Sequence, residues 1–171
     1  MPFVKINFAH QIVVNKNYLR SIPGLLKLVQ CLCCLISFLT IWLSCRSNYD
    51  PYLGTYSGFV GGDLETFALL IHFMLFMMTT LILAIYYLSI FASTIIPKTV
   101  FEFVYHLLAF ISQLIVSICL LITLVNRNQA DDGFPPEPGF KGKLTSSIFG
   151  LMASIVYGID ACYSYQSYIR S

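Results

Sequence analysis

Four long apolar runs, separated by polar segments, dominate the pattern of this sequence. The runs contain no Asp, Glu, Lys or Arg, and they cover residues 28–45, 67–96, 103–126 and 144–159. A helix needs about 20 mostly apolar residues to cross the hydrocarbon core of a bilayer. The pattern therefore predicts four transmembrane helices, at about 25–45, 67–96, 100–126 and 144–164.

The second run is longer than one crossing requires and shorter than two crossings would require. A single tilted helix whose ends reach the membrane interfaces is the simplest interpretation. Pro97 ends this run, because proline cannot continue a helix without losing a backbone hydrogen bond. Residues 46–65 and 127–144 contain several Gly or Pro residues, and this composition predicts two irregular loops.

The composition supports a membrane protein with one domain. Hydrophobic residues make up 57% of the 171 residues and charged residues 11%, whereas a soluble domain has about 25% charged residues. Residues 1–24 have no small-residue cleavage site of the kind that ends a signal peptide, so the first helix is expected to act as its own insertion signal. A net charge of +2 without a basic block excludes nucleic acid as an expected partner.

The distribution of Lys and Arg predicts the orientation of the four helices. Arg46 alone follows the first helix, whereas four basic residues precede or enter it: Lys5, Lys16, Arg20 and Lys27. Basic residues near helix ends tend to stay on the cytosolic side. We therefore predict a cytosolic N-terminal segment over 1–24, a four-span domain over 25–166 and a cytosolic tail over 167–171.

Three stretches of the sequence resemble the MARVEL-domain family of four-span membrane proteins. "NYLRSIPGLLKLVQCLCCLISFL" resembles the first helix of that family, which enters the membrane through Pro-Gly, and "FEFVYHLLAFISQLIVSICL" resembles its third helix. "FGLMASIVYGIDACYSYQSYIR" is similar to its fourth helix, where a Tyr-x-x-Asp-Ala motif with aromatic residues and a terminal Arg closes the domain. The resemblance covers about residues 17–170 and is nearest to the chemokine-like-factor, plasmolipin and MAL branch.

This resemblance, together with the four apolar runs, leads us to expect an all-α membrane protein with an antiparallel four-helix transmembrane bundle of the MARVEL type. It also implies a role in organising membranes, in vesicle trafficking, membrane apposition or fusion at lipid-rich regions. The implied location is the plasma membrane or vesicles. The implied partners are membrane lipids, cholesterol or sphingolipid among them, and other membrane proteins.

One acidic residue, Asp160, directly follows the fourth apolar run. At about 1.5 Å of rise per residue, it falls one to two turns from the cytosolic boundary. The same boundary holds Lys27 at the start of the first helix, and Glu102 and His106 one turn apart at the start of the third. We predict an intramembrane polar cluster in which Asp160 pairs with Lys27 or His106. The functional alternative is a proton relay or a contact with a partner.

The fourth run also carries small residues at every fourth position: Ser146, Gly150, Ser154 and Gly158. Small side chains at this spacing allow another helix to approach closely. Packing within the bundle and self-association into a homo-oligomer are both consistent with such a stripe. Deeper polar residues, Gln30 and Gln113, are interpreted as hydrogen-bonding between helices.

Cysteine and histidine residues give little indication of a metal or redox centre. The "CLCC" segment, 31–34, lacks further zinc ligands and is interpreted as buried packing. Cys162 lies near the cytosolic interface and is a candidate for palmitoylation. His72 has no companion ligand in the sequence and is interpreted as an interfacial or loop residue.

The sequence contains none of the usual catalytic motifs, and we predict that the protein is not an enzyme and has no cofactor. Two acids of the first predicted loop, Asp63 and Glu65, are interpreted as solvated. The alternative function is a small ion channel or transporter. It would use Asp160, His106, Glu102 and Gln113, but these ionisable groups gather at one boundary, whereas transport sites usually lie near the midplane.

Overall fold

The computed structural model describes residues 15, 17–46, 58–59, 61–129 and 137–170. Most of the predicted segment 1–24, including Lys5 and Lys16, and the last residue of the predicted tail lie outside the described residues.

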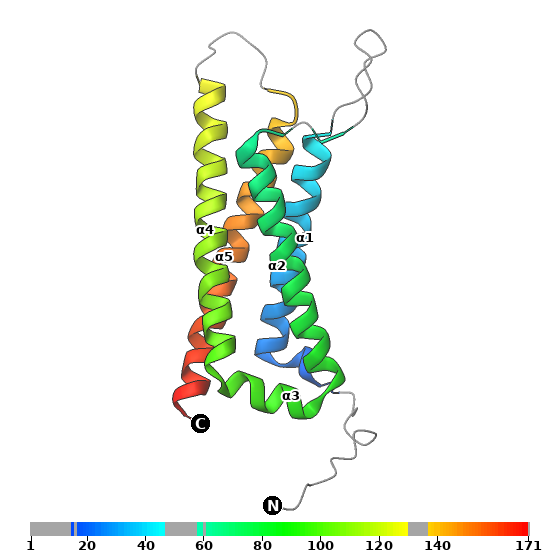
Figure 1. The fold of residues 1–171 in the computed structure, drawn as a ribbon, viewed down its shortest axis with the longest axis vertical. Helices are drawn as coiled ribbons and strands as arrows, with labels where there is room; N and C mark the ends of the chain where they lie inside the picture. Colours follow the sequence, from blue (N-terminus) through cyan, green and yellow to red (C-terminus); the bar gives the residue numbers. More distant parts are fainter. Residues whose placement is uncertain (1–14, 16, 47–57, 60, 130–136, 171) are drawn as a thin grey trace, which may run out of the picture.

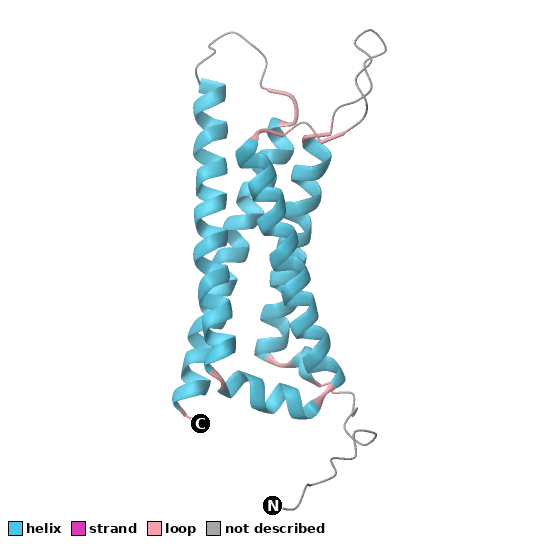
Figure 2. Ribbon diagram, viewed as in Figure 1, coloured by secondary structure: helices cyan, strands magenta, loops and turns pink. Residues whose placement is uncertain are grey.

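The described residues form four long helices, and each is long and apolar enough to cross a membrane. They are α1 (Ile22–Ser44), α2 (Asp63–Leu88), α4 (Val100–Gln129) and α5 (Phe140–Ile169). Figure 2 shows helices joined by loops, and the described residues contain only one isolated bridge, between Arg46 and Phe59, instead of a strand. The predicted all-helical chain with four potential spans is therefore confirmed.

The long helices lie side by side, and α5 packs most extensively against α4 and α1 (Figure 1). The starts of α1 and α4 and the ends of α2 and α5 lie at one end of the bundle, which we call the α3 end. Short elements complete this end: η2 (Tyr18–Arg20), α3 (Ile90–Ile95) and η3 (Ile96–Lys98). The other end, where α1 and α4 end and α2 and α5 begin, is called the loop end.

The single helix predicted over 67–96 is divided in the structure. Ser89 has extended backbone angles, φ −139° and ψ 114°, and its side chain accepts a hydrogen bond from the Ala92 amide. Ser89 therefore ends α2 and caps α3, because a serine at this position satisfies a free amide of the next helix. The apolar residues beyond Ser89 form α3, which lies across the end of the bundle (Figure 1) and exposes Phe91.

The bundle has an apolar exterior, and its interior contains polar groups beside an apolar core. Only 28–44% of the most apolar window of each long helix is buried inside the chain, and the exposed residues are mainly Leu, Ile, Phe and Met. The buried face of α2 instead carries polar groups at every seventh residue: Glu65, His72, Thr79 and Tyr86, each at most 1% exposed. Seven residues is about two helical turns, so these side chains lie on one face. An apolar exterior around buried polar groups is the arrangement that a bilayer favours.

The small residues of α5 pack within the chain. Ser146 and Ser37 donate hydrogen bonds to each other's backbone carbonyls, with O···O distances of 2.8 and 3.2 Å. Gly150 faces the side chains of Ser117 and Gln113 on α4. These contacts favour the intramolecular alternative for Ser146 and Gly150, whereas Gly158 is partly exposed and lines a groove between α4 and α5.

The two glycines of this stripe provide a matched test of that packing. A Cβ at Gly150 would overlap Ser117 Oγ and lie 3.1 Å from Gln113 Nε2, whereas a Cβ at Gly158 would meet only the Phe110 ring, at 3.3 Å. We expect Gly150→Ala to lower the free energy of unfolding by about 1–3 kcal/mol, as overpacking does. Gly158→Ala should cost less than about 1 kcal/mol. Thermal unfolding of both variants in detergent measures which one loses more stability. Equal losses of stability would contradict the packing described for α5.

Candidate functional site

At the α3 end, a lysine from α1 lies between carboxylates of α4 and α5. Lys27 Nζ is 2.6 Å from Glu102 Oε1 and 3.1 Å from Asp160 Oδ2. The Lys27 side chain is fully buried, and the two carboxylates are at most 3% exposed. Removing three charges from water is costly unless they are paired and hydrogen-bonded. The sequence-predicted residues of this cluster are thus brought together by three different helices.

Two further residues, which the sequence did not assign to the cluster, donate hydrogen bonds to its carboxylates. Gln30 on α1 donates from Nε2 to Asp160 Oδ2 at 3.0 Å, and the Tyr86 hydroxyl on α2 donates to Glu102 Oε2 at 2.8 Å. The Tyr86 ring also lies 5.5 Å from Lys27 Nζ, a cation–π distance. All four long helices therefore contribute to one buried network, which we call the basal cluster: Lys27, Gln30, Tyr86, Glu102, His106 and Asp160.

His106 is the fourth ionisable member of the basal cluster. Its Nε2 lies 3.2 Å from Asp160 Oδ2 and 3.6 Å from Glu102 Oε1, and neither ring nitrogen makes a hydrogen bond of good geometry. Lys27 supplies one positive charge and the two carboxylates supply two negative charges.

The basal cluster also has the side chains of a metal site. One ligand atom each from Glu102, His106 and Asp160 lies within 4.8 Å of the other two. Lys27 Nζ, however, contacts both carboxylates directly, at 2.6 and 3.1 Å. The chain itself therefore supplies the cation that these carboxylates require, and the geometry fits an internal ion cluster better than a metal centre.

The short element η2 covers the basal cluster. Tyr18 is buried against Tyr86, with ring centroids 5.2 Å apart. Burial, with a smaller contribution from the negative charges of Glu102 and Asp160, raises the pKa of Tyr18 well above its usual range. Gly24 permits this close approach of η2 to α1, because a Cβ there would overlap the Tyr18 carbonyl.

A second ionic cluster lies at the loop end. Glu65 Oε1 on α2 is 2.6 Å from Arg127 Nη1 on α4 and 3.4 Å from Lys143 Nζ on α5. Lys143 also binds Glu137 Oε1 at 2.9 Å. The interpretation of Glu65 as a solvated loop acid is wrong: α2 begins at Asp63, and Glu65 is 1% exposed. The two clusters thus join helices at both ends of the bundle.

Between the two clusters, neutral polar groups bind one another. His72 Nδ1 lies 2.9 Å from the amide nitrogen of Gln113. The Thr79 hydroxyl forms hydrogen bonds with the hydroxyls of Tyr105 and Tyr157. The interpretation of His72 as an interfacial or loop residue is therefore wrong, because it is fully buried on α2. Gln113 makes the interhelical contact that the sequence predicts.

The chain matches no protein-family model, no curated protein and no solved structure. The polar clusters therefore have to be interpreted from their own geometry. The residues of α2 that sequence reasoning missed share one signal, the seven-residue spacing of Glu65, His72, Thr79 and Tyr86.

The cysteines fall into two environments. Cys31, Cys33 and Cys34 are buried in α1, whereas Cys162 is exposed on α5. Cys162 lines an apolar groove of about 580 Å³ between α4 and α5, together with Phe103 and others. The palmitoylation candidate is thus accessible and lies beside a surface that suits acyl chains.

We expect the loss of the single Lys27 cation to destabilise the protein more than the neutralisation of one of the two acids. Lys27→Met leaves two buried carboxylates without their ammonium, and we expect it to lower the free energy of unfolding by roughly 3–5 kcal/mol. Asp160→Asn retains the Lys27–Glu102 pair and should cost roughly 1–3 kcal/mol. Thermal unfolding in detergent compares them, with the exposed Lys141→Met as a control that should change little. A larger loss for Asp160→Asn than for Lys27→Met would contradict this assignment of charges.

Proposed function

We propose that this protein is a multi-pass membrane organiser that acts in vesicle trafficking, membrane apposition or fusion at lipid-rich membrane regions. In this proposal the four helices form an antiparallel transmembrane bundle of the MARVEL type. The protein would reside in the plasma membrane or in vesicles and act through helix–lipid and helix–helix contacts, without catalysis.

The observation that carries the proposal is the exterior of the bundle. Exposed apolar side chains cover all four long helices, and the described connections at the α3 end are short elements packed on the bundle. Such a molecule presents its surface to lipid chains and to neighbouring transmembrane helices. The groove between α4 and α5 adds an apolar recess to that surface. Palmitoylation of Cys162 would place a further acyl chain beside this groove.

The basic residues of the sequence support the proposed cytosolic location of both chain ends: Lys5 and Lys16 of the predicted N-terminal segment add to four at the α3 end, against Arg46, Arg127, Lys141 and Lys143 at the loop end. Three basic residues are exposed at the α3 end: Arg20, Lys98 and Arg170. The acids described there, Glu102 and Asp160, are buried and bound to Lys27. An excess of Lys and Arg near helix ends favours the cytosolic side.

A small ion channel or transporter is the second candidate, because polar groups occur at several depths of the interior. Ionisable groups are not confined to one boundary as the sequence indicated: Glu65 lies at the loop end and His72 between the clusters. These groups bind one another directly, however. His72 pairs with Gln113, and Thr79 with Tyr105 and Tyr157, so protein contacts occupy the places where water or an ion would pass.

Reconstitution of the full chain in liposomes separates the two candidates. We expect proton and monovalent-cation flux no higher than in protein-free liposomes. We also expect proximity labelling of the full chain in cells to enrich proteins of vesicle traffic and membrane fusion. Flux that disappears in Gln113→Leu and persists in the lipid-facing control Met74→Leu would support the channel and contradict the organiser.

A further inference from the structure

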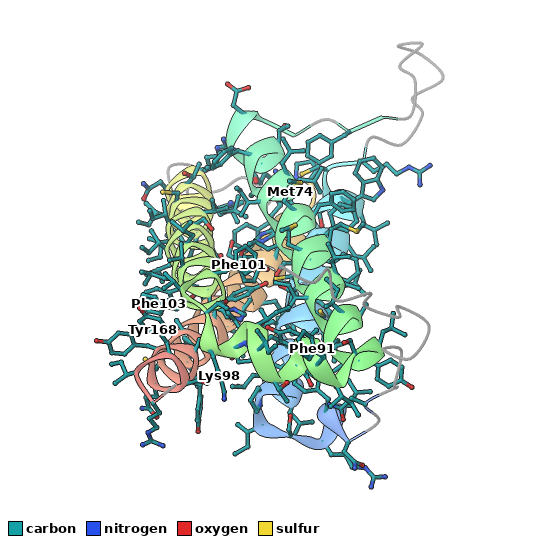
Figure 3. The ribbon with its side chains drawn as sticks, turned by 60° about the horizontal axis from the view of Figure 1, so that its bottom comes forward. Met74, Phe91, Lys98, Phe101, Phe103 and Tyr168 are labelled. Atoms are coloured by element: carbon teal, nitrogen blue, oxygen red, sulfur yellow. The ribbon has the colours of Figure 1, made fainter. Side chains whose placement is uncertain are left out.

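A pocket of about 350 Å³ lies at the α3 end, beside a smaller pocket that shares Tyr163 and Ser167 with it and reaches the acids of the basal cluster. The larger pocket is lined by residues of η3 and the last turns of α5: Lys98, Tyr163, Gln166, Ser167 and Arg170. Lys98 and Arg170 are far apart in the sequence, and the fold brings them to one pocket. Figure 3 shows Lys98 beside the final turns of α5.

The pocket carries positive charge that the described part of the chain does not neutralise. Neither Lys98 nor Arg170 forms an ion pair with another described residue, and no acid lines the pocket. The two nearby acids, Glu102 and Asp160, are committed to Lys27 inside the bundle. An anion is therefore the ligand that this pocket favours electrostatically.

The surroundings of the pocket place it at the depth of lipid headgroups. The adjoining α3 exposes Ile90, Phe91 and Ile95, which an interfacial helix would bury at the headgroup boundary (Figure 3). On the other side, the last turn of α5 ends at Ile169. The pocket thus lies where a spanning helix leaves the membrane.

We propose that this pocket binds the phosphorylated headgroup of an anionic phospholipid in the leaflet at the α3 end. The guanidinium of Arg170 and the ammonium of Lys98 contact phosphate oxygens, since Arg offers a planar fork of donors and Lys a point charge. The hydroxyls of Tyr163 and Ser167 and the amide of Gln166 supply neutral donors. This inference requires the chain to span a bilayer, but it does not depend on the organiser role.

A structural role for the same cations makes a different prediction. Arg170 follows the carboxyl end of α5, where a positive charge favours the helix dipole. Such a role would affect helix stability equally in every lipid. The measurement that separates the two roles is therefore the difference in affinity between an anionic and a neutral lipid, compared among variants of equal stability.

The test uses the purified full chain in a neutral detergent, with binding measured by native mass spectrometry. The probes are short-chain phosphatidylinositol 4-phosphate, short-chain phosphatidylcholine and inorganic phosphate. The variant is Lys98→Gln with Arg170→Gln. The matched control is Arg46→Gln with Lys141→Gln, which removes two exposed cations near the loop end. Thermal unfolding of each variant verifies that the fold is retained.

We expect the phosphoinositide to bind at least ten-fold more tightly than phosphatidylcholine. Each basic residue near the surface contributes roughly a five-fold factor to anionic-lipid binding, so the double variant should lose about 30-fold in affinity and the control about none. Equal binding of the two lipids, or equal losses in variant and control, would overturn the proposal. Inorganic phosphate that binds as tightly as the phosphoinositide would overturn the assignment to a lipid.

Discussion

The central constraint on this protein is that a charge inside a bilayer has no water to bind. Lys27, Glu102 and Asp160 are buried on three helices, and Lys27 Nζ lies within 3.1 Å of a carboxylate oxygen of each acid, so each charged group has a partner of opposite sign. Their positions fix the rotation and depth of α1, α4 and α5, since any helix that turned away would leave an unpaired charge. The hydrogen bond from Tyr86 to Glu102 extends the same constraint to α2.

The same constraint explains the ionic cluster at the loop end, where the buried Glu65 is also paired with basic residues. Glu65 binds Arg127 and Lys143, so polar contacts join α2, α4 and α5 at both ends, whereas the last turns of α1 pack at the loop end through the apolar cluster that contains Ile41. Polar contacts and apolar clusters together hold the interior, and the exterior is apolar. Lipid chains and neighbouring helices can therefore contact the bundle without competing for the groups that stabilise it.

Part of this arrangement could be predicted from the sequence. The lengths of the apolar runs indicated four spans, and the depth of Asp160 placed it level with Lys27, Glu102 and His106. The break at Ser89 was not predictable from hydropathy, because serine occurs within transmembrane helices. Glu65 was assigned to a loop because its charge precedes the apolar run, and only its partners Arg127 and Lys143 show why the helix can begin at Asp63. The spacing of the small residues does not specify how α5 is rotated, so the sequence could not show which helix Gly150 faces.

The most direct test of this account is the sidedness of the helix ends in a sealed membrane. Single cysteines would replace Arg20, Arg170, Arg46 or Lys141 in a cysteine-free chain, and a membrane-impermeant maleimide would be added to sealed vesicles of known orientation. The account predicts that positions 20 and 170 react from the cytosolic side and positions 46 and 141 from the opposite side. Labelling of positions 20 and 170 from different sides would contradict it, because Lys27 and Asp160 could then not lie at the same depth.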